Sequence, residues 1–371
     1  MVNLRKKRIL KDFEEKIKID PQNSCESKQA TVNNLKKFVQ EELRSTVDQV
    51  CQELIRIKKK EGEEEYEDAL YQMLQNWIEW NIKNGLGANT IKTRFSIIKD
   101  ILYFLGVKTN LQDIKQLLKF PKIMKDEKYP LQKEELRQMI NDQTRNLKRQ
   151  ALWLALTSSG MRIGEAITLK KADLNFSKSR IMIRLSPELT KTSTGRTVFL
   201  SKECQEKIMK YYDKLTDDEW VFTNSKAKDE KGRSRTERLG LENTLKRLGL
   251  TKRYSSNKYH LITSHSFRSY FFTKATRKHN QNYAHKMTGH GGYLMQYDRY
   301  TDDEKLEMYL ELEPKLIVDE QIENEMKISD LKDQVGKMTG IEQELSELRQ
   351  EIARIDKETI DKLIIRGAIV N

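Results

Sequence analysis

An arginine and a lysine in the middle of the chain have the chemistry to hold an anion. Gly160 allows one helix to end tightly and Arg162 opens the next, near backbone N–H groups that also favour anions. A planar guanidinium can donate two hydrogen bonds to phosphate oxygens, and Glu165 lies on the same predicted face, where it can orient that guanidinium. Lys191 falls in a predicted hairpin turn, where its ammonium can enter a groove and donate a proton.

A second group of reactive side chains follows about 75 residues later. His265 and Arg268 are three residues apart, so a helix would point the imidazole and the guanidinium the same way. His290 follows a glycine that breaks a helix, and Tyr297 and Tyr300 lie in the polar stretch after it. Taken singly, each of these features is common: a helical His–x–x–Arg pair often arises by chance, and a lone tyrosine is more often a half-buried anchor.

The order of these residues carries more information than any one of them. Arg, Lys, His–x–x–Arg, Gly–His and Tyr follow one another within about 140 residues, and this pattern resembles the active-site signature of the tyrosine recombinases, or phage-type integrases. The matching segments read SGMRIGEAITL, LTKTSTGRTVFL, TSHSFRSYFF, MTGHGG and YDRY. The resemblance covers the whole second domain expected from the sequence, residues 131–316.

The resemblance implies that five side chains surround one DNA phosphate: Arg162, Lys191, His265, Arg268 and His290. The arginines would stabilise charge on the non-bridging oxygens, His265 would act as the base and Lys191 as the acid for the departing 5′ hydroxyl. The product would be a 3′-phosphotyrosine. Because that bond keeps the energy of the ester, rejoining the strand is expected to need no cofactor and no metal.

Two tyrosines compete for the role of nucleophile. In many relatives the tyrosine follows the Gly–His pair by nine residues, a place that Arg299 occupies here. Tyr-Asp-Arg-Tyr-Thr resembles the Tyr–x–Arg–x–Thr run of archaeal integrase-like members, in which the first tyrosine attacks. We therefore expect Tyr297 to be the nucleophile, with Tyr300 as the alternative.

Hydrophobic periodicity predicts a mainly α-helical chain with a small antiparallel β-sheet, an α+β fold. Arg180–Leu185 and Arg196–Leu200 flank a polar, glycine-bearing turn, which is typical of a β-hairpin. We expect five parts: a charged arm at 1–30, a helical core-binding domain at 31–118 that contacts DNA, a basic linker at 119–130, a catalytic domain at 131–316 and a helical tail at 317–371.

The tail carries apolar residues at spacings of three and four: Ile328, Leu331, Val335, Met338, Ile341, Leu345, Leu348, Ile352 and Ile355. The interval from Met338 to Ile341 is three residues, although the alternating pattern predicts four. The pattern predicts a coiled coil with a local stammer, which would promote self-association. The alternative is a long amphipathic helix that packs on its own protein.

Charge and composition limit the classes of partner that the chain can have. The formal net charge is +13 although the tail is acidic, so the excess positive charge lies on the rest of the chain and favours a polyanion, here double-stranded DNA. No segment is apolar enough to span a membrane, and three widely separated cysteines form no metal-binding spacing, which together favour a cytoplasmic, nucleoid-associated protein.

We therefore expect a site-specific enzyme for DNA recombination or integration from a mobile element, acting as a homo-oligomer, a dimer or tetramer on DNA. Two other functions remain open at this point. One is relaxation of supercoils, as in type IB topoisomerases, whose active site is similar. The other is a non-catalytic DNA-binding protein on the same fold, which would keep the basic surface without the chemistry.

Overall fold

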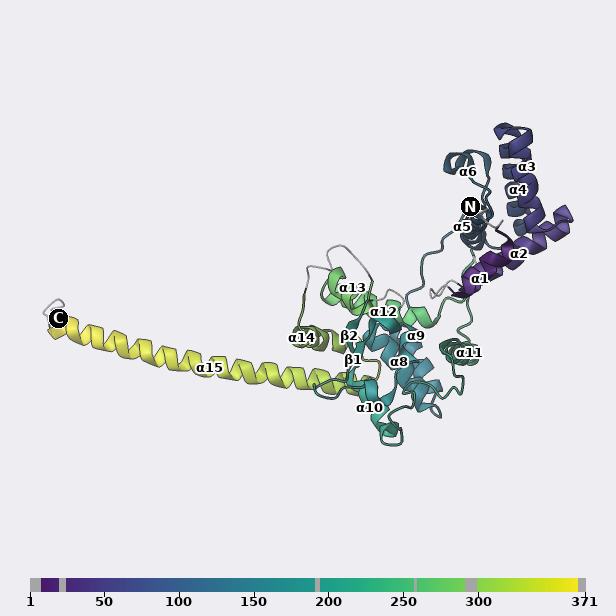
Figure 1. Cartoon of the computed structure of the whole chain (residues 1–371). Helices are drawn as coiled ribbons and strands as arrows, with labels where there is room; N and C mark the ends of the chain where they lie inside the picture. Colours follow the sequence, from purple (N-terminus) through teal and green to yellow (C-terminus); the bar gives the residue numbers. More distant parts are fainter. Residues whose placement is uncertain (1–7, 20–24, 191–193, 257–258, 291–298, 366–371) are drawn as a thin grey trace, which may run out of the picture. The chain divides into compact units, whose positions relative to one another are not determined.

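A computed structural model describes residues 8–19, 25–190, 194–256, 259–290 and 299–365 (Figure 1). The chain divides into two compact units, one formed almost entirely by residues up to Asp126 and one that begins at Glu127. The described part is mostly helical, with one small antiparallel sheet, which confirms the predicted α+β class. Within it, no helix combines the length and the apolar character needed to cross a membrane.

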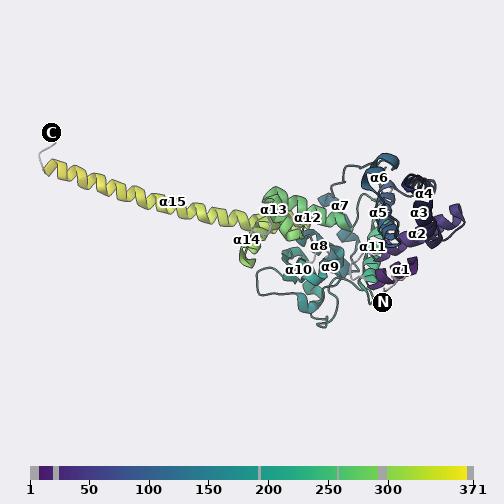
Figure 2. The ribbon, with the colours of Figure 1, turned by 45° about the horizontal axis from the view of Figure 1, so that its top comes forward.

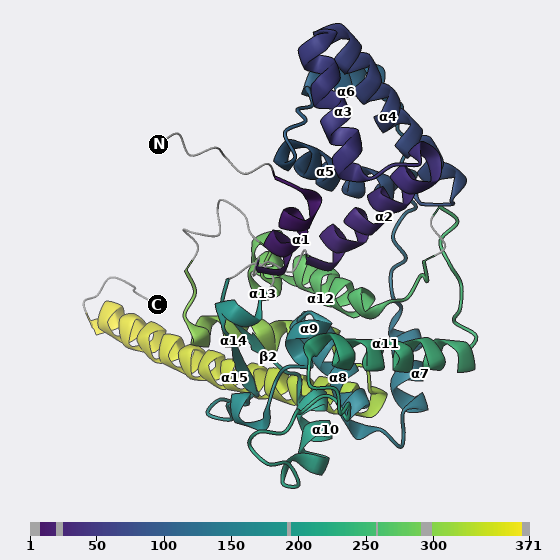
Figure 3. The ribbon, with the colours of Figure 1, turned by 45° about the vertical axis from the view of Figure 1, so that its right-hand side comes forward.

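The first unit contains only helices in its described part (Figure 3): α1 (Leu10–Ile19), α2 (Cys25–Leu43), α3 (Val47–Lys60), α4 (Glu63–Lys83), α5 (Ala88–Phe104) and α6 (Leu111–Leu117). Their apolar stripes meet in a single core around Trp77, Ile78 and Phe38. Leu10, a residue of the expected N-terminal arm, is buried in this same core. Burial of an apolar stripe, rather than propensity alone, is what stabilises such short helices.

The second unit is built around α8 (Leu147–Ser159), which is buried along most of its length. It packs against α10 (Lys202–Tyr212) and α12 (Ser264–Lys278). The other helices are α7 (Lys133–Asp142), α9 (Ile163–Ala166), α11 (Glu230–Arg247), α13 (Gln281–Thr288), α14 (Asp302–Leu312) and α15 (Glu320–Ile365), with 3₁₀ turns η1 (Lys171–Asp173), η2 (Pro187–Leu189) and η4 (Glu313–Lys315). A helix that is buried on all sides, such as most of α8, is stable when other elements surround it.

The expected hairpin is present. Strand β1 (Met182–Leu185) pairs antiparallel with β2 (Arg196–Phe199), with Met182 opposite Phe199 and Leu185 opposite Arg196. Arg184 is the exposed residue of β1, and a slip of one residue would move its guanidinium toward the buried side, which favours the observed register. The hairpin thereby places Arg196, its first paired residue on β2, next to the end of α13.

Ion pairs attach the C-terminal segment of the second unit to the hairpin region. Arg180 donates to Glu313 through Nε at 2.8 Å and Nη2 at 2.7 Å, and the Glu313 carboxylate also accepts from the backbone N–H of Lys202 at 2.6 Å. Glu313 is fully buried. The exposed end of α14 adds a pair between Lys178 and Asp303 at 2.5 Å. The buried carboxylate therefore joins η4, α10 and the approach to β1.

The long helix α15 follows directly (Figure 2). Its first turns are bound to α7 by ion pairs of Lys133 with Glu323 and of Arg137 with Glu320. Beyond these turns, the apolar stripe of α15 is exposed rather than packed on its own chain. The alternative of an amphipathic helix that buries its stripe on the same protein is therefore not what the structure shows.

Substitution of Glu313 tests the buried ion pair. Glu313→Ala leaves the partly buried Arg180 without its carboxylate, so the second unit should lose about 3 kcal/mol of stability. Asp303→Ala removes an exposed pair and should cost less than about 1 kcal/mol. Hydrogen-exchange protection of α10 and α12 measures both, and equal effects of the two variants would contradict this account.

Candidate functional site

Two helices of the second unit end in glycines with a left-handed backbone, and their ends meet. Gly160 ends α8 with φ of 65°, and Gly289 ends α13 with φ of 66°. A Cβ on Gly160 would approach Phe271 to 2.6 Å, so both the conformation and the space require glycine. The last carbonyls of a helix lack partners within the helix and carry partial negative charge, which suits them to hold cations.

Arg268 is the cation held by those carbonyls. It is 2% exposed and donates through Nη1 to the Gly160 carbonyl at 2.5 Å and through Nη2 to the Thr288 carbonyl. Its Nε has no hydrogen-bond partner among the described residues. Burial, followed by the charges of Arg162 and Arg196, lowers the pKa of Arg268 to about 9. The guanidinium is thus fixed in place, and no carboxylate in the described part of the chain forms an ion pair with it.

A single carboxylate serves the two neighbouring arginines. Glu165, 2% exposed, pairs with Arg162 at 2.8 Å and with Arg196 at 2.6 Å. Burial alone would raise the pKa of Glu165, but the contacts with Arg196 and Arg162 outweigh it and keep that pKa below its usual value. Among the described residues, two guanidiniums share this carboxylate and Arg268 lies nearby, which leaves an excess of positive charge for an anion to neutralise.

Thr288 fixes the ring of His290. The Thr288 hydroxyl donates its single hydrogen to the Ala284 carbonyl at 2.6 Å and lies 3.0 Å from His290 Nδ1. The hydroxyl oxygen must then accept from Nδ1–H, which leaves Nε2 of the neutral ring unprotonated, 3.4 Å from Arg268 Nη2. Partial burial, followed by the charge of Arg268, lowers the pKa of His290 to about 4, so the ring is neutral near pH 7.

His265 stands one helical turn before Arg268 on α12. It opens onto a pocket of about 410 Å³ whose described lining consists of His265, Arg268, Ser269, Phe272, Thr273, His285 and His290. Partial desolvation, followed by the charges of Arg268 and Arg162, lowers the pKa of His265, so this imidazole also favours its neutral, proton-accepting form. The pocket therefore combines neutral imidazoles with an excess of guanidinium charge.

Four of the expected site residues come together in this way: Arg162, His265, Arg268 and His290. Lys191 and Tyr297 lie outside the described residues. Tyr300 is described, and the ammonium of Lys286 on α13 lies 4.2 Å from the centre of its ring. The structure thus places Tyr300, one of the two candidates for the nucleophile, beside α13, the helix that ends at the site.

The structure adds two residues to which no role was assigned from the sequence. Arg196 donates through Nε to the Met287 carbonyl at 2.9 Å and pairs with Glu165, so it joins the end of α13 to the start of α9. His285 lines the pocket, with its ring centre 5.5 Å from that of His290. The sequence does contain a sign of His285's place, because all five histidines of the chain are clustered between His260 and His290.

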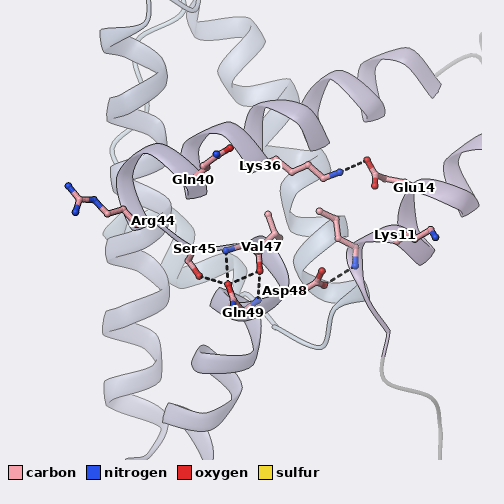
Figure 4. Close-up of a pocket in the computed structure, with 11 residues that line it drawn as sticks. Lys11, Glu14, Lys36, Gln40, Arg44, Ser45, Val47, Asp48 and Gln49 are labelled. Atoms are coloured by element: carbon pink, nitrogen blue, oxygen red, sulfur yellow. Dashed lines mark hydrogen bonds and ion pairs between the residues drawn. The ribbon is translucent and has the colours of Figure 1, made fainter.

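Another hollow, of about 830 Å³, lies within the first unit between α1, α2 and α3 (Figure 4). Polar contacts tie its walls together: Lys36 pairs with Glu14 at 2.8 Å, and Asp48 accepts from the backbone N–H of Leu10 at 2.8 Å. The figure shows these contacts crossing from helix to helix. These contacts hold α1 against α2 and α3.

The unbalanced charge of the histidine-lined pocket predicts anion binding that can be followed on His290. In the free protein the imidazole should titrate at about pH 4, because burial and Arg268 disfavour its charged form. A bound sulfate would offset the guanidinium charge and raise that pKa toward 6.5. NMR titration of the histidine ring signals with and without sulfate measures the shift, and Arg162→Ala, which removes one cation, should reduce it. An unchanged titration in sulfate would show that no anion binds there.

Comparison with known proteins agrees with this geometry. The model of the phage integrase family matches residues 129–307. The tyrosine recombinase XerA of Pyrococcus horikoshii is 25% identical over 192 residues, which are 52% of this chain and 61% of the relative, so the match spans about three fifths of that protein.

Two solved structures share the fold. A lambda integrase dimer bound to a core site superposes with a TM-score of 0.53 at 13% identity, over 79% of this chain and 98% of that one. A lambda integrase tetramer bound to a Holliday junction gives 0.54 at 14% identity, over 78% of each chain. The family match identifies residues 129–307 as a phage integrase domain.

Proposed function

We propose that this chain is a site-specific recombinase that cuts a DNA strand with a tyrosine, holds the end as a 3′-phosphotyrosine and rejoins it to another end. The observation that carries the proposal is the convergence of Arg268, His265 and His290 at one pocket, close enough to Arg162 for its charge to lower the pKa of all three. The named relatives support it: one is called a tyrosine recombinase, and lambda integrase was solved on a core site and on a Holliday junction.

The charge of the cluster matches the needs of the reaction. A phosphodiester has one negative charge, and a second develops on its non-bridging oxygens as the incoming oxygen approaches phosphorus. Arg162, Arg196 and Arg268 outnumber Glu165 by two charges, so the cluster complements the transition state better than the ground state. Because Arg268 is already held by two carbonyls, its position costs little reorganisation when the phosphate arrives.

We assign the proton transfers to His265 and Lys191. The tyrosine oxygen attacks phosphorus while the bond from phosphorus to the 5′ oxygen breaks. His265, kept neutral by its surroundings, accepts the phenolic proton, and Lys191 donates a proton to the departing 5′ oxygen. Reversal of the same steps with a different 5′ hydroxyl rejoins the strand, so the energy of the ester is conserved. His290 supports the phosphate and Arg268 from the other side.

The organisation of the chain follows from the proposed substrate. We propose residues 31–118 as a DNA-contacting domain, 119–130 as the basic linker and 131–316 as the catalytic domain, with the arm at 1–30 and the tail at 317–371 as appendages. Several copies would assemble on DNA, as a dimer or tetramer. An enzyme with this substrate works in the cytoplasm beside the nucleoid.

Trapping on DNA identifies the nucleophile. A library of nicked duplexes of randomised sequence avoids the need to know the recognition site, because a nick near the scissile bond lets the short 5′ fragment escape and blocks rejoining. Wild-type chain and Tyr300→Phe should form a covalent adduct that survives denaturation, whereas Tyr297→Phe should lose it by at least about 10³-fold, because phenylalanine has no oxygen to attack phosphorus.

Peptide mapping of the adduct provides the direct readout, and Tyr103→Phe, a change at an exposed tyrosine of the first unit, is the matched control. Adduct lost in Tyr300→Phe and kept in Tyr297→Phe would transfer the role to Tyr300. Binding without any adduct in the wild-type chain would contradict the enzyme and favour a DNA-binding protein.

A further inference from the structure

The exposed stripe of α15 is symmetric along the chain. From Ile328 to Leu348 the intervals between apolar residues are three, four, three, then three, four, three, so the pattern reads the same in both directions from Met338. Each of these seven side chains is between 49% and 62% exposed, which is unusual for a continuous apolar row. Gly336 and Gly340 also lie at equal distances on either side of Met338.

We propose that α15 binds the α15 of a second copy of this chain in antiparallel orientation, with a two-fold axis at Met338. In this arrangement Ile328 packs against the partner's Leu348, Leu331 against the partner's Leu345 and Val335 against the partner's Ile341. Met338 meets the partner's Met338. Two-fold symmetry repeats each contact, so the seven residues of each helix all become covered.

The break in the heptad pattern fits this orientation. If Ile328 and Val335 occupy position a, then Leu331 and Met338 occupy d, but beyond the break Ile341 and Leu348 occupy d and Leu345 occupies a. The proposed pairs of residues on either side of Met338 therefore all join an a residue to a d residue, as antiparallel coiled coils require. The change in twist falls at the axis, where Gly336 and Gly340 leave the backbone least hindered.

Charges beside the stripe favour the same orientation. In an antiparallel pair, a residue beside the stripe lies close to the partner residue that is two positions away from the one directly opposite. This rule brings Lys332 near the partner's Glu342 and Glu325 near the partner's Arg349. It also brings Lys327 near the partner's Glu351; within its own helix Lys327 already pairs with Glu323 at 3.0 Å, so it would bridge both carboxylates. Each of these three pairs joins opposite signs.

A parallel, in-register pair is less favourable. There, each flanking residue meets the one five positions further along the partner, so Lys327 would face the partner's Lys332. Glu344 would face the partner's Arg349, which is favourable, but the lysine repulsion offsets that gain. Opposite signs at the three pairs beside the stripe therefore favour the antiparallel arrangement.

The arrangement also sets a distance. Glu320, where α15 begins, lies 18 residues from Met338, so the first residues of the two helices would be separated by roughly 54 Å along the axis at 1.5 Å per residue. The tail would thus join two catalytic domains that are held well apart. Two separate stretches of DNA could be occupied by copies joined in this way, whatever chemistry follows.

A charge exchange tests the orientation in the full-length chain without DNA, so its outcome is independent of strand cleavage. Lys332→Glu should raise the dissociation constant of the dimer about 3- to 10-fold, because Glu would face the partner's Glu342. Glu342→Lys should weaken it similarly, and the double variant should restore wild-type affinity. Neither position has a charged residue three or four places away in the helix, so helix stability is little affected. Sedimentation equilibrium gives the constants.

The opposite outcome for Lys332→Glu identifies the parallel pair, where that change would relieve the repulsion from the partner's Lys327 and tighten binding. Disulfide formation gives a second, independent measure. A mixture of Leu331→Cys and Leu345→Cys chains should link through these positions, as mapped by mass spectrometry, and Leu331→Cys alone should not link to itself. Self-linkage of Leu331→Cys, or a wild-type chain that stays monomeric at high concentration, would overturn the proposal.

Discussion

The site depends on Arg268, which backbone carbonyls hold in place of a carboxylate of its own, and on Arg196, which a carbonyl and the shared Glu165 hold together. The ends of α8 and α13 supply the carbonyls of Gly160 and Thr288 to Arg268, and that of Met287 to Arg196. A carboxylate in the same place would have cancelled the charge, whereas a helix end offers only a partial negative charge. The arginines are consequently fixed in geometry and still able to attract an anion.

The same charge controls the histidines. Desolvation and the nearby guanidiniums lower the pKa of His265 and of His290, which keeps both rings neutral in the absence of an anion. Arrival of a phosphate would offset that field, so proton acceptance becomes favourable only when the proposed substrate is present. Charge excess, ring protonation and substrate binding are therefore parts of one electrostatic arrangement.

Much of this could be predicted from local sequence. The hairpin, the helix that begins beside Arg162, the shared face of His265 and Arg268 and the glycine before His290 are set by neighbours within a few residues. The contact of Arg268 with the Gly160 carbonyl joins residues 108 positions apart, and no spacing rule reveals such a partner.

Three further features could not be predicted from the spacing of residues in the sequence. The bridging role of Arg196 and the place of His285 in the pocket also arise from tertiary packing. The choice between Tyr297 and Tyr300 is not settled by spacing either, because the interval from His290 fits neither tyrosine. The segment with Tyr297 connects α13, whose end forms the site, to α14, which Arg184 and Lys178 attach to the hairpin region through Asp302 and Asp303.

The central claim is that these guanidiniums act on the negative charge of one phosphate. Replacing the scissile phosphate by a neutral methylphosphonate removes that charge and leaves the rest of the DNA intact. On ordinary DNA, Arg162→Ala should reduce formation of the covalent adduct by at least about 10²-fold. On methylphosphonate DNA the same substitution should cost little, because no charge remains to be neutralised. An equally large loss on both substrates would contradict the account.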